Sequence, residues 1–253
     1  AGLSNYPMLA EHFDLVGALA RTALWVTVVV LGTIGLSLFL ANFLNKAFPG
    51  RTVIRLIVIV PWASSVLMTT MVVFYAFEPN YGLVNEALRL LSEHLPGLSA
   101  FAGGDFGFTR AMPWAFIIAI VIAVFVSLPF TTYTLLAGHQ GISRDVLEAA
   151  AVDGARPRQT YFKVVLPQLR PALAASAIIN IINVFNSFPI LKVMTGHLPG
   201  FDADTTTTLM FKILQSNRRV DLASALSVIN FGIVIVVIVI YMLVVKPLKS
   251  VED

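Results

Sequence analysis

The sequence predicts an all-α, polytopic transmembrane protein, and two observations lead to this fold class. The 253 residues are 57% hydrophobic and only 12% charged, with a mean hydropathy of +0.84, whereas soluble domains carry about 25% charged residues. Five segments also run for about 20 residues or more with few or no charges, the length of a helix that crosses a hydrocarbon layer of about 30 Å. Soluble core helices are rarely so long and so apolar on every face. We therefore interpret residues 1–253 as a single transmembrane domain.

The five predicted spans cover residues 22–45, 54–77, 111–137, 171–194 and 222–245, with boundaries read from hydropathy and charge. The stretch before them, AGLSNYPMLAEHF, lacks the basic region that opens a signal peptide. It also lacks an initiator methionine, so we expect a further span to precede residue 1. Cysteine is absent and the four histidines have no metal-ligand spacing, so no disulfide or metal site is predicted.

Basic residues orient the predicted spans, because cytoplasmic loops of membrane proteins carry an excess of Lys and Arg. Three regions that alternate onto one side hold ten of the 17 basic residues: Lys46, Arg51, Arg55, Arg144, Arg156, Arg158, Lys163, Arg170, Lys246 and Lys249. The other side holds the acidic residues Glu78, Glu86, Glu93, Asp105, Asp202, Asp204 and Asp221, together with Lys212, Arg218 and Arg219. We therefore expect the loop over 138–170 and the C-terminus to be cytoplasmic.

The predicted cytoplasmic loop contains signals for two short helices. Ser143 can cap a helix over 144–152, in which three consecutive alanines favour the helix and have almost no side-chain bulk. Gly154 supplies the left-handed residue that ends such a helix. Pro157 suits the first turn of a second helix, and Pro167 would end or kink that helix before the fourth span. From these residues alone, a structured connector and a docking element for another protein remain alternatives.

The spacing in this loop resembles the EAA loop of binding-protein-dependent ABC importer permeases. The matching residues are Glu148, Ala149, Ala150, Gly154, Val164, Leu166 and Pro167, and the family usually has Ile where Val164 stands. Four other stretches are similar to the carbohydrate-uptake branch of this family, which includes maltose-type and glycerol-phosphate-type permeases. They are PWASSVL, EPNYGLVN, LLAGHQGISRDVLEAAAVDGA and ASALSV.

This resemblance implies a type I ABC importer permease fold of six spans, of which the chain would lack the first. It implies that the loop is a coupling helix that docks on a cytoplasmic ATPase through Glu148, Ala149, Ala150, Asp153, Gly154, Leu166 and Pro167. The implied partners are a second permease subunit in a heterodimer, two ATP-binding subunits that hold ATP and Mg²⁺, an extracytoplasmic solute-binding protein or lipoprotein, and membrane lipid. The outer loops over 78–110 and 192–221 would face the binding protein, in the cell membrane of a bacterium or archaeon.

Polar residues inside the predicted spans are the candidate solute contacts, because a polar side chain is costly there unless it faces protein or water. The fourth span has Asn180, Asn183 and Asn186 at a spacing of three, followed by Ser187, and the third span has Ser127 beside Pro129. Asparagine also joins helices within membranes, and this packing role is the alternative for each of them. The resemblance favours sugar contacts for the segment NVFNSFPILKVMTG, in which Phe185 or Phe188 could stack on a sugar ring.

Other functions are disfavoured by what the sequence lacks. We find no Walker motif, nucleophile elbow or Gly-rich phosphate loop, so ATP hydrolysis is expected on a separate subunit and this chain is not expected to be an enzyme or to bind a cofactor. The basic residues orient spans, so no nucleic-acid partner is expected. A secondary transporter or channel without an ATPase and a membrane scaffold remain alternatives. We assign no ionisable residue to midspan, which disfavours ion coupling and also a phosphorylated solute.

Overall fold

The computed structural model describes residues 3–95, 108–109, 112–198, 200 and 203–245. Within these residues the regular structure is helical, so the all-α prediction is confirmed. The chain divides into two compact units, each assembled from separate segments. Unit 1 comprises 1–29, 64–123 and 185–233, and unit 2 comprises 30–63, 124–184 and 234–253. Asp105, Asp202, Lys246 and Lys249, which entered the charge comparison, lie outside the described residues.

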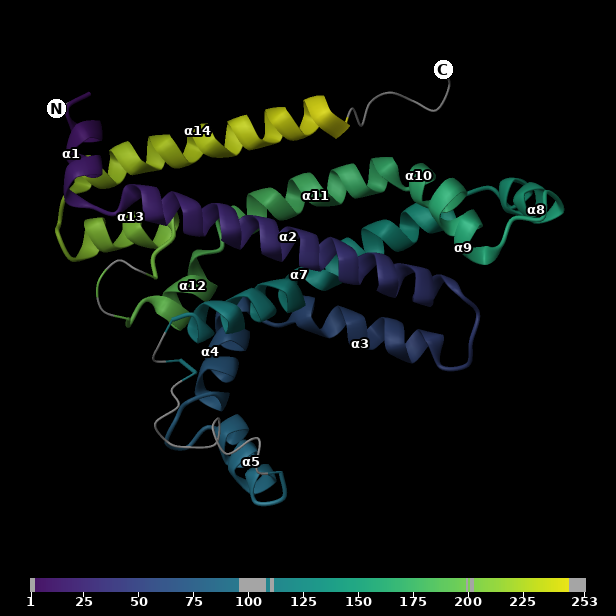
Figure 1. The fold of residues 1–253 in the computed structure, drawn as a ribbon, viewed down its shortest axis with the longest axis horizontal. Coiled ribbons are helices and arrows are strands. Elements are labelled where there is room, and N and C mark those ends of the chain that lie inside the picture. The colour runs from purple at the N-terminus through teal and green to yellow at the C-terminus, as the bar shows by residue number, and fades with distance from the viewer. Residues whose placement is uncertain (1–2, 96–107, 110–111, 199, 201–202, 246–253) are drawn as a thin grey trace. The chain divides into compact units, whose positions relative to one another are not determined.

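The helices follow the order shown in Figure 1. Their bounds are α1 Asn5–His12, α2 Leu15–Asn45, α3 Arg51–Ala63, α4 Val66–Ala76, α5 Leu83–Ser92, α7 Trp114–Gln140, α8 Arg144–Val152, α9 Pro157–Thr160, the π-helix η2 Tyr161–Val165, α10 Leu166–Gln168, α11 Arg170–Phe185, α12 Phe188–Thr195, α13 Thr206–Gln215 and α14 Val220–Val245.

Three described helices are each long and apolar enough to cross a membrane: α2, α7 and α14 over Val220–Leu243. They correspond to the predicted first, third and fifth spans, although α2 begins seven residues earlier than predicted and α7 covers 114–140 where 111–137 was predicted. Helix α7 continues through Pro129. Near this proline, Thr131 donates to the Ser127 carbonyl (3.1 Å) and Thr134 to the Phe130 carbonyl (2.9 Å).

The second and fourth predicted spans are each interrupted. The second is divided at Ser64 and Ser65 into α3 and α4, and the fourth is divided after Phe185 into α11 and α12. Pro189 explains the second break, because proline has no N–H to donate to the carbonyl four residues earlier, which is that of Phe185. The Thr207 hydroxyl donates to this carbonyl instead, at 3.2 Å. Among the described residues, the count of possible spans rises from three to five only if two bent helix pairs each count as one span, namely Arg51–Ala63 with Val66–Ala76 and Pro157–Gln168 with Arg170–Phe185.

Each unit has its own apolar core. In unit 1 the core joins α1, the start of α2, α13 and the start of α14, through Leu9, Ala18, Leu209, Ile213, Leu222, Ala223, Ala225 and Leu226. In unit 2 it joins the last part of α2 to α7, through Ala41, Leu44, Leu135 and Leu136. Gly138 lets α7 approach α11 closely, because a Cβ atom there would lie 3.0 Å from the Ala172 Cβ and the Leu169 Cδ2 atoms. Unit 2 carries the predicted cytoplasmic loop.

Candidate functional site

Helix α8 within the predicted coupling loop has the bounds that the sequence predicts, Arg144–Val152. The Ser143 hydroxyl accepts a hydrogen bond from the Asp145 backbone N–H at 3.2 Å, which satisfies one of the unpaired groups at the helix start. Gly154 has φ +74°. The N–H of Ala155 reaches the Ala150 carbonyl and the N–H of Gly154 reaches the Ala151 carbonyl, both at 3.0 Å, the bond pattern of a Schellman motif. The chain therefore closes both ends of α8 itself.

Most of α8 is exposed, since among its residues only Ala150 is buried and only Leu147 is half-buried. Asp145, Glu148, Ala149 and Val152 recur at the spacing of one helical face and all four are exposed, whereas Ala150 faces the chain's own interior. Val152 is 87% exposed, although burial of such a side chain would contribute about 1.5–3 kcal/mol. The small side chain of Ala149 allows another surface to come close to the helix backbone. This face is chemically suited to contact with a second protein.

The second helical segment of the loop starts as predicted, with Pro157 in the first turn of α9. The Arg156 backbone N–H donates to the Gln159 side-chain carbonyl at 2.8 Å and fixes this start. The segment then passes through the π-helix η2 and ends after Pro167, and the path bends by 64° into α11. The predicted kink at Pro167 is therefore confirmed, and the loop leads directly into α11.

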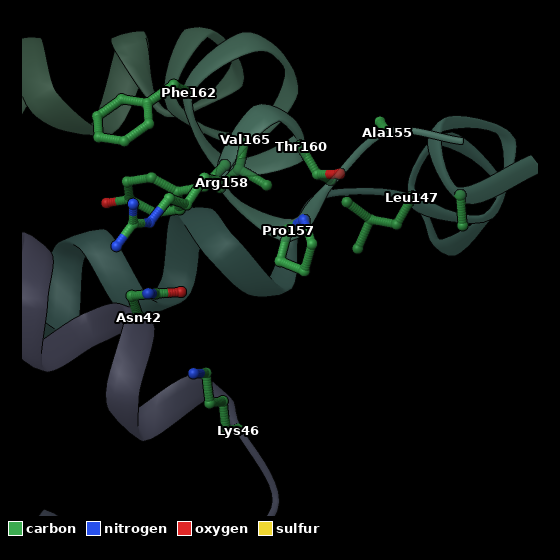
Figure 2. A pocket seen from close by; sticks show the side chains of 11 residues that line it. Asn42, Lys46, Leu147, Ala155, Pro157, Arg158, Thr160, Phe162 and Val165 are labelled. Carbon is green, nitrogen blue, oxygen red and sulfur yellow. The ribbon is translucent and has the colours of Figure 1, made fainter. Parts of the chain in front are cut away.

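A cavity of about 560 Å³ lies between α8, at Leu147 and Ala151, and the helical segment that begins at Pro157. Figure 2 shows Leu147, Pro157, Arg158 and Phe162 around it, with Asn42 and Lys46 contributed by the end of α2. The full lining is Asn42, Lys46, Leu147, Ala151, Ala155, Pro157, Arg158, Thr160, Tyr161, Phe162 and Val165. Helix α8 is thus held by its ends and by Ala150, with incomplete packing along the side that carries Ala151.

The five candidate solute contacts have different surroundings. Asn180 is 3% exposed, and its side-chain amide donates at 2.8 Å both to the Thr131 hydroxyl on α7 and to the Ser176 carbonyl. Both amide hydrogens are therefore used, which favours the helix-packing alternative for Asn180. Ser127 is half-buried on α7 and Asn183 is exposed on α11, both in unit 2.

Asn186 and Ser187 lie at the interruption between α11 and α12, in unit 1. Asn186 is exposed and Ser187 is half-buried. The spacing of three predicts one continuous helical face for the asparagines, but α11 ends before Asn186, so only Asn180 and Asn183 belong to the same helix. The solute role of Ser127, Asn183, Asn186 and Ser187 stays a prediction.

A buried charged cluster in unit 1 was missed from the sequence. Asp204 is fully buried and lies 2.8 Å from the Lys212 ammonium, while Arg21 donates to the Asp204 backbone carbonyl at 2.7 Å. Arg21 also contacts Asp14 at 3.0 Å. The pKa of the Asp14 carboxyl lies below its ordinary value, chiefly because the Gly17 backbone N–H donates to it and secondarily because of Arg21.

The segment that carries this cluster was expected to be an outer loop over 192–221. The structure instead forms α13, whose start is closed by hydrogen bonds between Thr205 and Thr208. The Thr206 backbone N–H donates to the Thr22 hydroxyl at 2.9 Å, which attaches α13 to α2. The threonine run and the apolar positions after it were the available signals for a capped helix. Lys192, assigned to the same loop, lies inside α12.

Comparison with known proteins identifies the family. A family model described as "binding-protein-dependent transport system inner membrane component" matches residues 33–250. The chain belongs to this family. This permease is 34% identical over 241 residues to a probable ABC transporter permease protein of Brucella suis biovar 1 (strain 1330), covering 94% of this chain and 80% of the relative. It is 32% identical over 244 residues to the trehalose/maltose transport system permease protein MalF of Thermococcus litoralis, covering 95% and 78%.

Solved structures agree with this fold. A bacterial ABC transporter involved in the import of the acidic polysaccharide alginate superposes with a TM-score of 0.83 at 20% identity, covering 99% of this permease and 85% of that chain. The same type of transporter, in complex with an alginate pentasaccharide-bound periplasmic protein, gives a TM-score of 0.82 at 21% identity, covering 95% and 81%. The predicted ABC importer permease fold is therefore confirmed, and the chain is a transport subunit of the inner membrane.

Proposed function

We propose that this permease is the membrane-spanning subunit of an ATP-driven importer that takes a sugar or sugar-like solute from an extracytoplasmic binding protein and passes it to the cytoplasm. Named relatives support the solute class, because they include permeases for trehalose and maltose, for sulfoquinovosyl glycerol and for sn-glycerol-3-phosphate. The relatives handle neutral and anionic solutes, so this support extends to sugars and sugar-like molecules as a class.

The observation that carries the proposal is the exposed face of α8. It belongs to a helix with closed ends and presents Glu148, Ala149 and the apolar Val152 to solvent. In the proposed complex this face docks on a cytoplasmic ATPase subunit that binds ATP and Mg²⁺, and the orientation of the basic residues places the loop on that side of the membrane. A docked carboxylate such as that of Glu148 needs a cationic or hydrogen-bonding partner on the ATPase.

Movement of α8 can be transmitted to the spans through a short series of contacts in unit 2. A tight turn of four residues joins α8 to the segment from Pro157 to Gln168, and this segment continues into α11 after the single residue Leu169. The Asn180 amide ties α11 to α7. A displacement imposed at α8 by two closing ATPase subunits would therefore move α7 and α11 together. In a pair with a second permease subunit, such rigid-body movement around a central site gives alternating access.

In this proposal Asn183, Asn186, Ser187 and Ser127 supply the neutral hydrogen-bonding groups that a polyhydroxylated solute requires, since amides and hydroxyls both donate and accept. Asn180 acts as a positioning residue, because its own amide is already used within the permease. The solute-binding protein or lipoprotein would deliver the solute at the opposite side from α8, and lipid surrounds the apolar outer faces of the long helices.

The test is coupling in the reconstituted importer. Glu148→Lys reverses the charge on the docking face, and Gly154→Pro prevents the left-handed conformation that ends α8. Both variants should enter the membrane normally and yet lose solute-stimulated ATPase activity and uptake. Glu11→Lys, the same charge change at an exposed position on α1, should leave both activities near those of the unmodified protein. Normal co-purification of active ATPase together with undiminished uptake in both α8 variants would refute the coupling role.

A further inference from the structure

A positively charged side chain lies beside two aromatic rings on neighbouring helices of unit 1. Phe188 and Lys192 are four residues apart on α12 and therefore lie on the same side of that helix. Both meet Phe211 on α13. The ring centroids of Phe188 and Phe211 are 4.4 Å apart, and the Lys192 ammonium lies 5.3 Å from the centroid of the Phe211 ring. A cation at this distance is attracted by the negative face of the ring.

Gly196, four residues after Lys192, leaves room for the lysine stem. A Cβ atom on Gly196 would lie 2.8 Å from the Lys192 Cδ atom, so the absence of a side chain at Gly196 provides the space that the lysine stem uses. Packing of the stem and attraction of the ammonium by the Phe211 ring together restrict a side chain that would otherwise have about 2 kcal/mol of rotamer entropy. The charge of Lys192 is therefore fixed in place before any ligand arrives.

The described part of unit 1 does not neutralise this charge. Lys212, on the helix turn beside Phe211, is paired with Asp204 at 2.8 Å, but none of the ion pairs among described residues includes Lys192. Helix α4, which packs against α12, carries no acidic residue, and neither does α13. Lys192 is half-buried, and a partly desolvated cation is stabilised by an opposite charge.

We propose that Lys192, Phe188 and Phe211 form part of a solute site that selects an anionic sugar, with the Lys192 ammonium paired to a carboxylate, sulfonate or phosphate group on the solute. This inference rests on the proposed function. The aromatic rings provide apolar faces for a sugar ring, and Asn186 and Ser187, directly before Phe188, provide groups for its hydroxyls. This proposal reverses the expectation from the sequence, which assigned no cation to midspan and on that basis disfavoured a phosphorylated solute.

The experiment measures ATP-dependent uptake by the complete importer in liposomes, with its binding protein in excess. The solutes are labelled disaccharides in matched sets: the neutral sugar and the same sugar bearing a uronic carboxylate, a sulfonate or a phosphate ester. The variants are Lys192→Met, which keeps the stem and removes the charge, and Lys192→Arg, which keeps the charge. Arg218→Asn is the matched control, because Arg218 is exposed after α13 with φ +52°, a conformation that asparagine tolerates.

We expect the unmodified importer to favour an anionic member of a set. Lys192→Met should reduce its uptake at limiting concentration by about ten- to a hundredfold, the loss expected for a hydrogen bond to a charged group, while uptake of the neutral member changes less than twofold. Lys192→Arg should restore most of the uptake, and Arg218→Asn should change neither member. Comparison of the three anionic sugars shows whether the importer prefers the carboxylate, the sulfonate or the phosphate ester.

Two results overturn the inference while leaving the proposed function intact: preference of the unmodified importer for the neutral sugars, or an equal loss of neutral and anionic uptake in Lys192→Met, which would assign Lys192 a structural role. The proposed function itself fails in a different way. In that case the unmodified importer shows no ATP-dependent uptake of any sugar in the sets, and the inference falls with it.

Discussion

The buried ion pair between Asp204 and Lys212 predicts that removal of Lys212 alone strongly destabilises the permease. Removal of both charges should restore most of that stability. Asp204 is 0% exposed and Lys212 is 15% exposed, with 2.8 Å between the ammonium and the carboxylate. Among the described residues neither carboxylate oxygen accepts a well-directed hydrogen bond, so the attraction is mainly Coulombic. Lys212→Met would leave a buried carboxylate without its counter-charge, a change that costs about 3–5 kcal/mol.

We expect the lower part of this range, because Arg21 stays near the same segment through its bond to the Asp204 carbonyl. About 3 kcal/mol corresponds to a fall in unfolding temperature of about 6–12 °C for a chain of this size. The double variant Asp204→Leu with Lys212→Met removes both charges, and replacing a buried pair by apolar residues is often neutral. Its unfolding temperature should therefore lie within about 4 °C of the unmodified protein.

The assay is the temperature at which the purified permease loses its monodisperse peak in size-exclusion chromatography after heating in detergent. Lys163→Met, at an exposed lysine, controls for the loss of a positive charge alone. The reasoning is refuted if Lys212→Met destabilises no more than Lys163→Met does, or if the double variant is less stable than the single one.

Three further outcomes follow from other contacts. In a double-mutant cycle, Asn180→Leu and Thr131→Val should show a coupling energy of about 0.6–1.7 kcal/mol in thermal unfolding, and additive effects would contradict the bond between α7 and α11. Gly138→Val should lower the free energy of unfolding by about 1–3 kcal/mol through overpacking against α11. Gly50→Val is the comparison variant for backbone strain alone, because a Cβ atom at Gly50 would meet nothing within 4 Å while its φ is +85°. Thr207→Val should cost about 1–3 kcal/mol by leaving a backbone carbonyl unpaired at the interruption, and an unchanged unfolding temperature would contradict this.

The helices of the loop over 138–170 could be predicted closely because their signals are local. A capping serine, a run of alanines and a glycine act on the backbone within a few residues, so the bounds of α8 and the left-handed Gly154 follow from sequence alone. Hydropathy likewise identified α2, α7 and α14, because a long uncharged segment can be recognised from its own residues without information about the helices that pack against it.

The interruption of the fourth span was not predicted because hydropathy averages over the residues that cause it. Pro189 was visible in the sequence, but the group that makes the break tolerable is the Thr207 hydroxyl, 22 residues away from the Phe185 carbonyl that it bonds. No local pattern reveals this pairing. The same limit led to Lys192 and α13 being assigned to an outer loop, since their order depends on contacts between α12 and α13.

The candidate solute contacts show how the surroundings separate residues of one type. Asn180 and Asn183 are three residues apart on one helix, yet Asn180 is bonded to α7 and Asn183 is exposed. The sequence left both roles open for each asparagine. Which side of α11 meets α7 depends on packing, including the close approach at Gly138, and packing is not encoded in a helical spacing of three.

The closed ends of α8 also reduce the conformational entropy that its proposed docking would lose. A segment that folds only on contact must lose about 1–2 kcal/mol of backbone entropy per residue as it binds. Helix α8, nine residues long and already closed by Ser143 and Gly154, has lost that entropy during folding of the permease. Docking would therefore lose little free energy to the ordering of α8 itself, and the energy of contact would mainly have to offset desolvation and the lost translational and rotational freedom of the two proteins.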